Sequence, residues 1–361
     1  MKTALRIPSI LFAVSLVLTP SAGSAQDITV GTNIWHPRWG GTDSDPFVNS
    51  YQNVSGPNPW RAEFIEEVSH YTAIRFMDLG GLNSGEEPAS WADRTRQSES
   101  NQMPMAYEWM IDMCNRAGTD MWICIPYLWD QDLPGCRSLA QLIHSTLSDS
   151  LRVYVEYGNE NWSTAYNQTY CRERGVAIGL GPSSQTTGDR YSAYASMKIW
   201  EEFEAVIGRG SPRLVRVLSG WDVSASTCGT QLGFLITDTT RNPNKTMPDL
   251  YCTAPYIAPC PLSTIGEKVT EMAGGLRSHL SILSRAGNIP LGYYEGGFGD
   301  CSHETIATDP AAYDAMCMYL DTLNHYGGGT FMHLNHSSHR WGAKLYIGQP
   351  QTHVAGKRRA R

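Results

Sequence analysis

Eight short apolar runs recur along the chain and set the strongest limit on its fold. They are rich in β-branched and aromatic residues, as strands are, and they occupy 28–35, 73–79, 121–127, 151–157, 214–219, 250–256, 291–295 and 330–335. Between them the pattern predicts helices over 59–71, 106–117, 138–148, 191–207, 265–286 and 311–326. Nearly continuous apolar strands are typical of parallel sheets covered on both faces. The alternation therefore predicts an α/β protein, a single (β/α)8 TIM barrel.

A doubly wound open sheet is the structural alternative to this barrel. Such a sheet that binds a dinucleotide has a glycine-rich turn directly after its first strand. Here the first run is followed by HPRWGG, which contains no GxGxxG pattern. No internal repeat, low-complexity tract or proline-rich linker divides the chain, so we expect one catalytic domain over 26–350.

The two ends of the chain have compositions of their own. Residues 1–25 combine Lys2 and Arg6 with a short apolar stretch and small residues, which is typical of a cleaved signal peptide. An uncleaved anchor is the alternative. Residues 351–361 are basic, which suggests a disordered tail or, alternatively, a tether to a membrane or polyanion. We therefore expect a secreted or periplasmic protein without membrane insertion.

Charge narrows the range of partners. The formal net charge is −7, although six positive charges fall within the two terminal segments. An acidic body argues against nucleic acid and other polyanions as main partners. We expect a monomer that acts on a polysaccharide or oligosaccharide.

Nine cysteines in an exported chain suggest disulfides. Cys124 and Cys252 fall within predicted strands and are expected to be buried thiols. The candidates for disulfides fall in predicted loops and are Cys136, Cys171, Cys228, Cys260 and Cys301. No CxxC pair or zinc-like spacing occurs, and His333, His336 and His339 would fall on different faces of an extended segment. We expect neither a metal nor a cofactor.

Two glutamates stand where a barrel would place its active site. In (β/α)8 enzymes the catalytic groups lie at the carboxyl ends of the strands. Glu160 ends the fourth predicted strand and Glu295 ends the seventh. A protonated and an ionised carboxyl facing each other suit glycoside hydrolysis, in which one acts as acid and the other as nucleophile. Either residue alone would be read as a solvated turn carboxylate.

With these residues in place, the sequence resembles glycoside hydrolase clan A, the retaining (β/α)8 enzymes that include many cellulases, mannanases and xylanases. The segments RFMD, SWADR, VYVEYGNENW and YYEGG suggest a bacterial secreted group within it. The resemblance covers most of the chain. It implies that Glu160 is the acid/base, that Glu295 is the nucleophile and that Asn159 binds the sugar 2-hydroxyl.

The resemblance also assigns further substrate-binding residues. Arg75 matches an arginine near the nucleophile, Tyr256 a tyrosine that hydrogen-bonds it, and Trp341 a tryptophan beneath the reacting sugar. One position departs from the pattern, because Tyr127 stands where a histidine is expected after the third strand. This departure puts the contacts with the substrate in question, but not the carboxylate pair.

Other residues at the strand ends are candidates from their position alone. Asp78 follows Arg75 on the second strand, and Trp35, Trp129 and Trp162 lie where an aromatic face could stack on a sugar. Glu156 shares a strand face with Glu160, so it should point into the barrel. Because a lone buried charge is costly, we expect Arg75 or another arginine to pair with it.

The sequence favours a secreted retaining β-glycoside hydrolase, acting within a plant or microbial polysaccharide by double displacement. A carbohydrate-binding protein that has lost catalysis is one alternative, which the intact glutamates argue against. A polysaccharide lyase is another, and it would need a Tyr or His base and a cation to neutralise a uronate.

Overall fold

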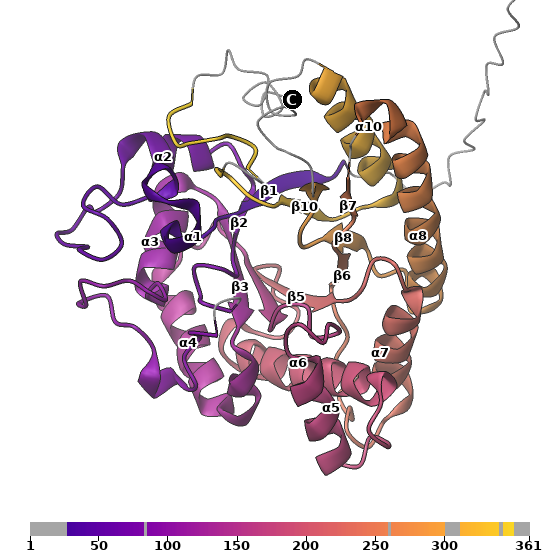
Figure 1. Cartoon of the computed structure of the whole chain (residues 1–361). Coiled ribbons are helices and arrows are strands. Elements are labelled where there is room, and N and C mark those ends of the chain that lie inside the picture. The colour runs from indigo at the N-terminus through magenta and orange to yellow at the C-terminus, as the bar shows by residue number, and fades with distance from the viewer. Residues whose placement is uncertain (1–26, 83–84, 259–260, 300–310, 339–341, 350–361) are drawn as a thin grey trace, which may run out of the picture.

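A closed barrel of eight parallel strands forms the centre of the computed structural model (Figure 1). The structure describes residues 27–82, 85–258, 261–299, 311–338 and 342–349. In chain order the barrel strands are β1 (Thr29–Asn33), β2 (Ala73–Phe76), β3 (Asp120–Ile125), β4 (Val153–Tyr157), β5 (Leu214–Ser219), β6 (Leu250–Thr253), β8 (Leu291–Tyr293) and β10 (Thr330–His333). Each pairs with its neighbour in the sequence, and β1 closes the ring against β10. The predicted (β/α)8 barrel is confirmed.

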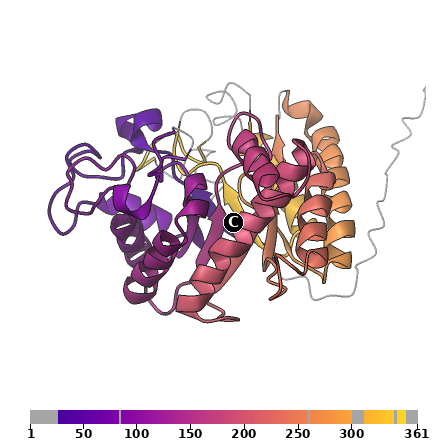
Figure 2. The same cartoon turned by 90° about the horizontal axis from the view of Figure 1, so that it is seen from below.

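Helices surround the barrel, as the views in Figure 1 and Figure 2 show. The longer ones are α2 (Ala62–Val68), α3 (Tyr107–Ala117), α4 (Leu133–Thr146), α5 (Gln168–Ala177), α6 (Gln185–Ile207), α7 (Ala225–Thr237), α8 (Ile265–Arg285) and α10 (Ala311–Tyr326). Short elements decorate the loops: α1 (Pro37–Gly40), η1 (Thr42–Ser44), η2 (Trp91–Asp93), η3 (Tyr127–Gln131) and η4 (Leu262–Thr264). A two-stranded parallel sheet of β7 (Tyr256–Ile257) and β9 (Gly297–Phe298) lies beyond the ends of β6 and β8.

The sequence pattern located all eight barrel strands and six of the helices. It placed several strand ends two or three residues too late, as for β2 and β3, because apolar residues continue beyond the strand into the turn that follows. It missed α5, which is polar along most of its length, and α7, whose apolar residues carry no clear spacing. Neither helix presents the regular apolar stripe on which such a prediction depends.

The barrel interior is filled by side chains that alternate along the strands with those packed against the helices. This inner cluster includes Trp122, Tyr154, Cys252, Tyr294 and Met332, all buried. The indole of Trp122 stacks on the ring of Tyr154, with centroids 5.1 Å apart. The barrel is therefore a packed core that supports whatever lies at its upper rim.

The cysteines differ from expectation. Cys124 and Cys252 are buried thiols, as predicted. Cys136, Cys171 and Cys228 are also buried free thiols, so their assignment to disulfides is wrong. All three lie on helices (α4, α5 and α7) and face the core, where a thiol behaves as a small apolar group. The other two disulfide candidates, Cys260 and Cys301, lie outside the described residues.

A polar cluster fastens the segment after β10 to helix α2. The Glu67 carboxylate pairs with Lys344 and lies 2.8 Å from the Nε2 atom of His336. The backbone N–H of Gly348 donates to the same carboxylate at 2.9 Å. These partners, after the cost of burial, lower the pKa of Glu67 to about 2. The chain after the last strand is thus held against the barrel.

Within the described ranges, no helix is both long enough and apolar enough to span a membrane. The same ranges hold no group of three or more His, Cys, Asp or Glu side chains arranged for a metal ion. Residues 1–25 and 351–361, the predicted signal peptide and basic tail, lie outside the described part of the chain.

Gly31 on β1 offers a direct test of barrel packing. A Cβ atom at this position would lie 2.4 Å from the Met332 sulfur and 2.7 Å from the Ala73 carbonyl oxygen. We expect Gly31→Ala to lower the free energy of unfolding by about 1–3 kcal/mol, because the interior is already filled. Denaturant unfolding monitored by circular dichroism measures the change.

Gly233 on α7 supplies the matched control, since a Cβ atom there meets nothing within 4 Å. Gly233→Ala should leave stability unchanged or raise it by about 0.5–1 kcal/mol, because alanine is the better helix former. Equal stabilities for the two variants would contradict the packing described for the barrel.

Candidate active site

A tight turn after β4 presents Asn159 and Glu160 at the rim of the barrel. Gly158 has φ 66° and Glu160 has φ 46°, both in the left-handed region. A Cβ atom on residue 158 would lie 2.3 Å from the Asn161 side-chain oxygen, so glycine is required there. Asn161 donates back to the Tyr157 carbonyl at 2.6 Å and closes the turn. A left-handed glutamate costs on the order of 1–3 kcal/mol, and such strain is concentrated at functional sites.

Arg75 on β2 is the centre of the site, and its side chain is fully buried. Its Nε atom donates to Glu156 at 2.8 Å, and its Nη1 atom donates to Glu295 at 2.7 Å. Two amides complete the set, because Nη1 also donates to Asn33 and Nη2 donates to Asn159, each at 3.0 Å. One guanidinium therefore fixes groups from β1, from β4 and its turn, and from the end of β8. The expected pairing of Glu156 with Arg75 is confirmed.

Glu295 has a second partner on its other oxygen. The Tyr256 hydroxyl donates to Oε2 at 2.8 Å, while Arg75 holds Oε1. Tyr256 belongs to β7, so the small outer sheet is what brings it over the barrel mouth. The carboxylate is held at both oxygens in one orientation, as a nucleophile that attacks a fixed point must be.

Glu160 occupies a less polar environment. Its Oε1 atom accepts a weak hydrogen bond of 3.4 Å from the Tyr294 hydroxyl, and no arginine of the described ranges forms an ion pair with it. Burial, followed by the negative charge of Glu295, raises the pKa of Glu160 to about 8. The carboxyl therefore carries its proton at neutral pH, which is the state that a general acid requires.

The two carboxyls differ in pKa because Arg75 pairs with Glu295 and not with Glu160. Burial raises the pKa of Glu295 too, but Arg75 and the Tyr256 hydrogen bond oppose that rise. When the pair holds a single proton, Glu160 retains it, because the positive charge and both donors favour ionisation of Glu295. The site thus contains one acid and one base at the same pH.

Asp78 lies beside this pair. Its Oδ2 atom accepts the backbone N–H of His36 at 2.8 Å, which ties β2 to the segment after β1. Burial, together with the charge of Glu295, raises the pKa of Asp78 to about 6. Asp78 is thus close enough to Glu295 to be affected by its charge, and its assignment as a substrate ligand stays a prediction.

The aromatic residues that the sequence predicted for sugar binding lie in different environments. Trp162 is half-buried and stacks on Trp221, with centroids 5.3 Å apart and planes 9° from parallel, and Trp221 is 40% exposed. Trp35 is half-buried directly after β1. Trp341 lies outside the described residues.

Trp129 does not form part of the rim. It is fully buried, its indole N–H donates to the Pro88 carbonyl at 2.8 Å, and it packs edge-on against Trp91. The prediction that Trp129 stacks on a sugar is therefore wrong. Its position on η3, a turn that folds inward beneath the loop after β2, is the reason.

Two hollows flank the carboxylate pair. One, of about 280 Å³, lies over the ends of β2, β3 and β4 and is lined by residues that include Glu87, Tyr127 and Tyr166. The other, of about 370 Å³, lies beyond β5 and β6. Burial and then the charges of Glu160, Glu295 and Asp78 raise the pKa of Tyr166 to about 12, which places that tyrosine next to the site.

Sequence reasoning missed Asn33 and Tyr294. Asn33 is the last residue of β1, pairs in register with Arg75 and donates to the Tyr294 carbonyl at 3.2 Å. Tyr294 precedes Glu295, and strict alternation would put their side chains on opposite faces. In the structure β8 ends at Tyr293, so both side chains reach the barrel mouth. The position of Asn33 at a strand end was the one signal that could have identified it.

The comparisons with known proteins show the fold. No protein-family model matches the sequence, and no curated protein sequence does. The structure is similar to a GH5-4 broad-specificity endoglucanase from an uncultured bacterium (13% identity, 92% of this chain and 93% of that one, TM-score 0.50). It is also similar to a family 26 endo-β-1,4-mannanase from Cellulomonas fimi (10% identity, 93% and 71%, TM-score 0.51). A psychrophilic family 10 endo-β-1,4-xylanase gives 10% identity, coverages of 93% and 97% and a TM-score of 0.51.

The predicted resemblance to the clan A glycosidases is therefore confirmed in the fold. Identities this low establish architecture, whereas chemistry has to be argued from the site itself.

The raised pKa of Glu160 makes a prediction about stability. The native carboxyl keeps its proton up to pH about 8, while the unfolded one loses it near its ordinary value of 4.5. Between these values the unfolded state binds fewer protons, so the free energy of unfolding falls as pH rises. Glu160→Gln removes this penalty and should stabilise the protein by on the order of 1–3 kcal/mol at pH 8 and little at pH 4.5.

Urea unfolding of both proteins at the two pH values measures this difference. Glu66→Gln, which removes an exposed carboxylate on α2, is the control and should show no such dependence. A stabilisation that is equal at both pH values would show that Glu160 is not protonated in the native state.

Proposed function

We propose that this chain is a retaining β-glycoside hydrolase, exported from the cytoplasm, that cleaves within a polysaccharide. The observation that carries the proposal is the inequality of the two carboxyls. Arg75 and Tyr256 hold Glu295 ready to attack, while burial keeps Glu160 protonated. A binding protein has no need of such a pair. A lyase would need a Tyr or His base at this place, and here the central tyrosine instead donates to a carboxylate.

In the first step Glu295 attacks the anomeric carbon and forms a glycosyl ester. Glu160 gives its proton to the leaving glycosidic oxygen, so that the leaving group departs as a neutral alcohol. The negative charge of Glu295 is consumed in this step, and the electrostatic cause that raises the pKa of Glu160 disappears with it. The newly ionised Glu160 is then suited to act as a base.

In the second step Glu160 removes a proton from water, which attacks the anomeric carbon and releases Glu295. Arg75 and Tyr256 stabilise the departing carboxylate with the same two contacts that held it before. Asn159 is held at the rim by Arg75, from where we expect its amide to bind the sugar 2-hydroxyl. That hydrogen bond strengthens as the oxocarbenium-like transition state forms.

The shape of the barrel mouth favours cleavage at an internal bond of a long glycan. A hollow lies over the ends of β2, β3 and β4, and the stacked Trp162 and Trp221, which follow β4 and β5, offer an exposed aromatic face. The similar barrels include an endoglucanase, an endo-β-1,4-mannanase and an endo-β-1,4-xylanase. These names support a polysaccharide as substrate by analogy of fold.

Two substitutions separate the roles of the glutamates. Glu295→Gln should lower turnover by at least about 10⁴-fold on any substrate, because the ester cannot form. Glu160→Ala should spare the first step on aryl glycosides whose leaving group needs no proton, and added azide should restore turnover by replacing water. Initial rates with and without azide measure both effects, with Glu66→Gln as a carboxylate control that should retain full activity.

Product stereochemistry tests the proposal as a whole. Proton NMR of the first-formed product from a β-linked glycan should show the β-anomer, since two displacements restore the configuration. An α-anomer would mean inversion at a single step and would rule out Glu295 as nucleophile. Full activity of Glu295→Gln would refute the assignment independently.

A further inference from the structure

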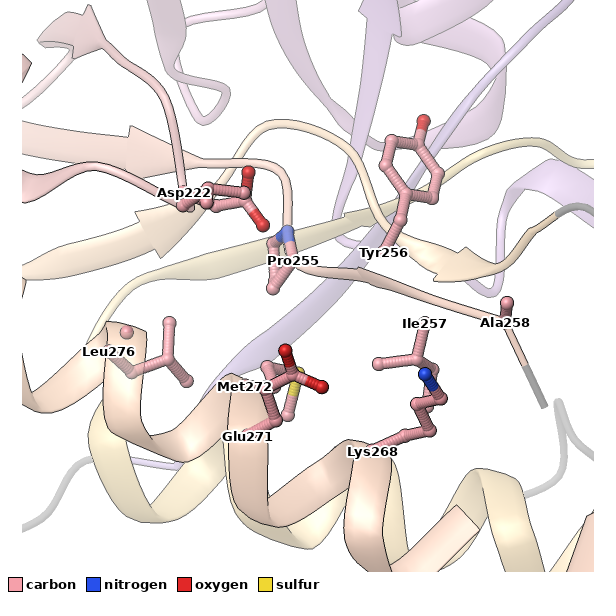
Figure 3. Close-up of a pocket in the computed structure, with 11 residues that line it drawn as sticks. Asp222, Pro255, Tyr256, Ile257, Ala258, Lys268, Glu271, Met272 and Leu276 are labelled. Atoms are coloured by element: carbon pink, nitrogen blue, oxygen red, sulfur yellow. The ribbon is translucent and has the colours of Figure 1, made fainter. Parts of the chain in front are cut away.

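A side pocket opens between strand β7 and helix α8, next to the active site. It has a volume of about 370 Å³, and the loop after β5 closes it with Asp222 and Val223. Figure 3 shows Lys268, Glu271 and Met272 rising from α8 toward Ile257 on β7. Tyr256 belongs to both sites, because its backbone borders the pocket while its hydroxyl points away from α8 and binds Glu295.

Strand order shows how this pocket lies relative to the substrate path. On one side of the ring only β6 and β5 separate β8, which leads to Glu295, from β4, which leads to Glu160. A glycan that passes between the two carboxyls must leave the mouth on this short side or on the opposite one. The pocket lies on the short side, and the charge of Asp222 contributes to raising the pKa of Glu160.

The pocket is part of the rigid fold. The His279 ring on α8 is buried, and its Nε2 atom lies 3.1 Å from the Trp221 carbonyl oxygen. Gly275 on the same helix allows close approach of the loop, since a Cβ there would lie 3.2 Å from the Asp222 carbonyl oxygen. The loop after β5 is thus seated on α8, and the hollow between them exists before any ligand arrives.

The lining combines one apolar wall with a few charged groups. Pro255, Ile257, Met272 and Leu276 supply the wall, and the charged groups are two carboxylates and one ammonium, those of Asp222, Glu271 and Lys268. Such a mixture suits a polyhydroxylated ring, whose C–H face packs on apolar groups and whose hydroxyls bind the charged ones. Because the pocket has two carboxylates and one ammonium, it disfavours a negatively charged ligand.

We propose that this pocket binds a neutral single-sugar branch of the polysaccharide, so that the enzyme prefers a branched glycan to its linear backbone. The inference rests on the proposed glycosidase function and adds a specificity to it. The pocket is near the lower end of the volumes of small-molecule sites, and α8 forms its far wall. It therefore suits a short substituent better than the continuing main chain.

Matched pairs of substrates test the proposal. The pairs are xyloglucan with linear β-1,4-glucan, galactomannan with linear β-1,4-mannan, and arabinoxylan with linear β-1,4-xylan, compared by kcat/KM. We expect the wild-type enzyme to favour the branched member of the pair whose backbone it cleaves. Met272→Trp fills the pocket and should lower kcat/KM on that branched member at least tenfold, with the linear one changed less than twofold.

Thr270→Trp is the matched control, because Thr270 is exposed on the same helix and does not line the pocket. It should leave both members of the pair unchanged. An equal loss on the branched and linear members with Met272→Trp, or no loss on either in the folded variant, would overturn the inference and leave the proposed function standing. No hydrolysis of any substrate by the wild-type protein would refute the proposed function, and the inference would fall with it.

Discussion

One buried arginine between two carboxylates is the interaction on which the site depends. Arg75 is fully buried, and so is Glu156, while Glu295 is 5% exposed. Removing such charges from water is expensive, and only close pairing with further hydrogen bonds compensates for the cost. Loss of one partner would leave an uncompensated charge, at about 3–5 kcal/mol. The network therefore locks β2, β4 and the end of β8 into one arrangement and orients the groups that we propose react.

Glu156 gives this network its charge balance. If Arg75 paired with Glu156 alone, its charge would be neutralised below the rim. If it paired with Glu295 alone, it would hold that carboxylate too tightly for it to react. Shared between the two, the guanidinium orients Glu295 and leaves a net negative charge at the barrel mouth. That charge helps to keep the proton on Glu160, so the protonation states of Glu160 and Glu295 depend on each other.

Several features of this rim lower the stability of the protein, and a purely structural element would avoid them. Glu160 adopts a left-handed backbone and holds a carboxyl that resists ionisation, and Asp78 is a further buried acid beside it. All three features lower stability, and the packed interior of the barrel below tolerates them. Their concentration at one end of the barrel is the pattern expected of a functional site.

Sequence periodicity was sufficient to predict the barrel and the pairing of Arg75 with Glu156, because both follow from which side chains must be buried. The carboxylate pair followed from strand ends and from the resemblance to clan A. Side-chain direction beyond a strand end was not predictable, so Trp129 was placed on the rim although η3 turns it inward. Cys171 and Cys228 were taken for loop residues because the polar sequence around α5 and the irregular one around α7 conceal helices. Cys136 was taken for one because α4 begins at Leu133, before the predicted start at 138.

Direct titration of the two glutamates tests the central claim most closely. Isotope-edited infrared or carbon NMR spectra of the wild-type protein, assigned with Glu160→Gln and Glu295→Gln, would follow each carboxyl from pH 3 to pH 9. The account predicts that Glu295 ionises first, while Glu160 retains its proton through neutral pH and titrates near pH 8. It also predicts that the apparent pKa of Glu160 falls in the Glu295→Gln variant, because the neighbouring charge is gone. A protonated Glu295 facing an ionised Glu160 at pH 7 would contradict the account.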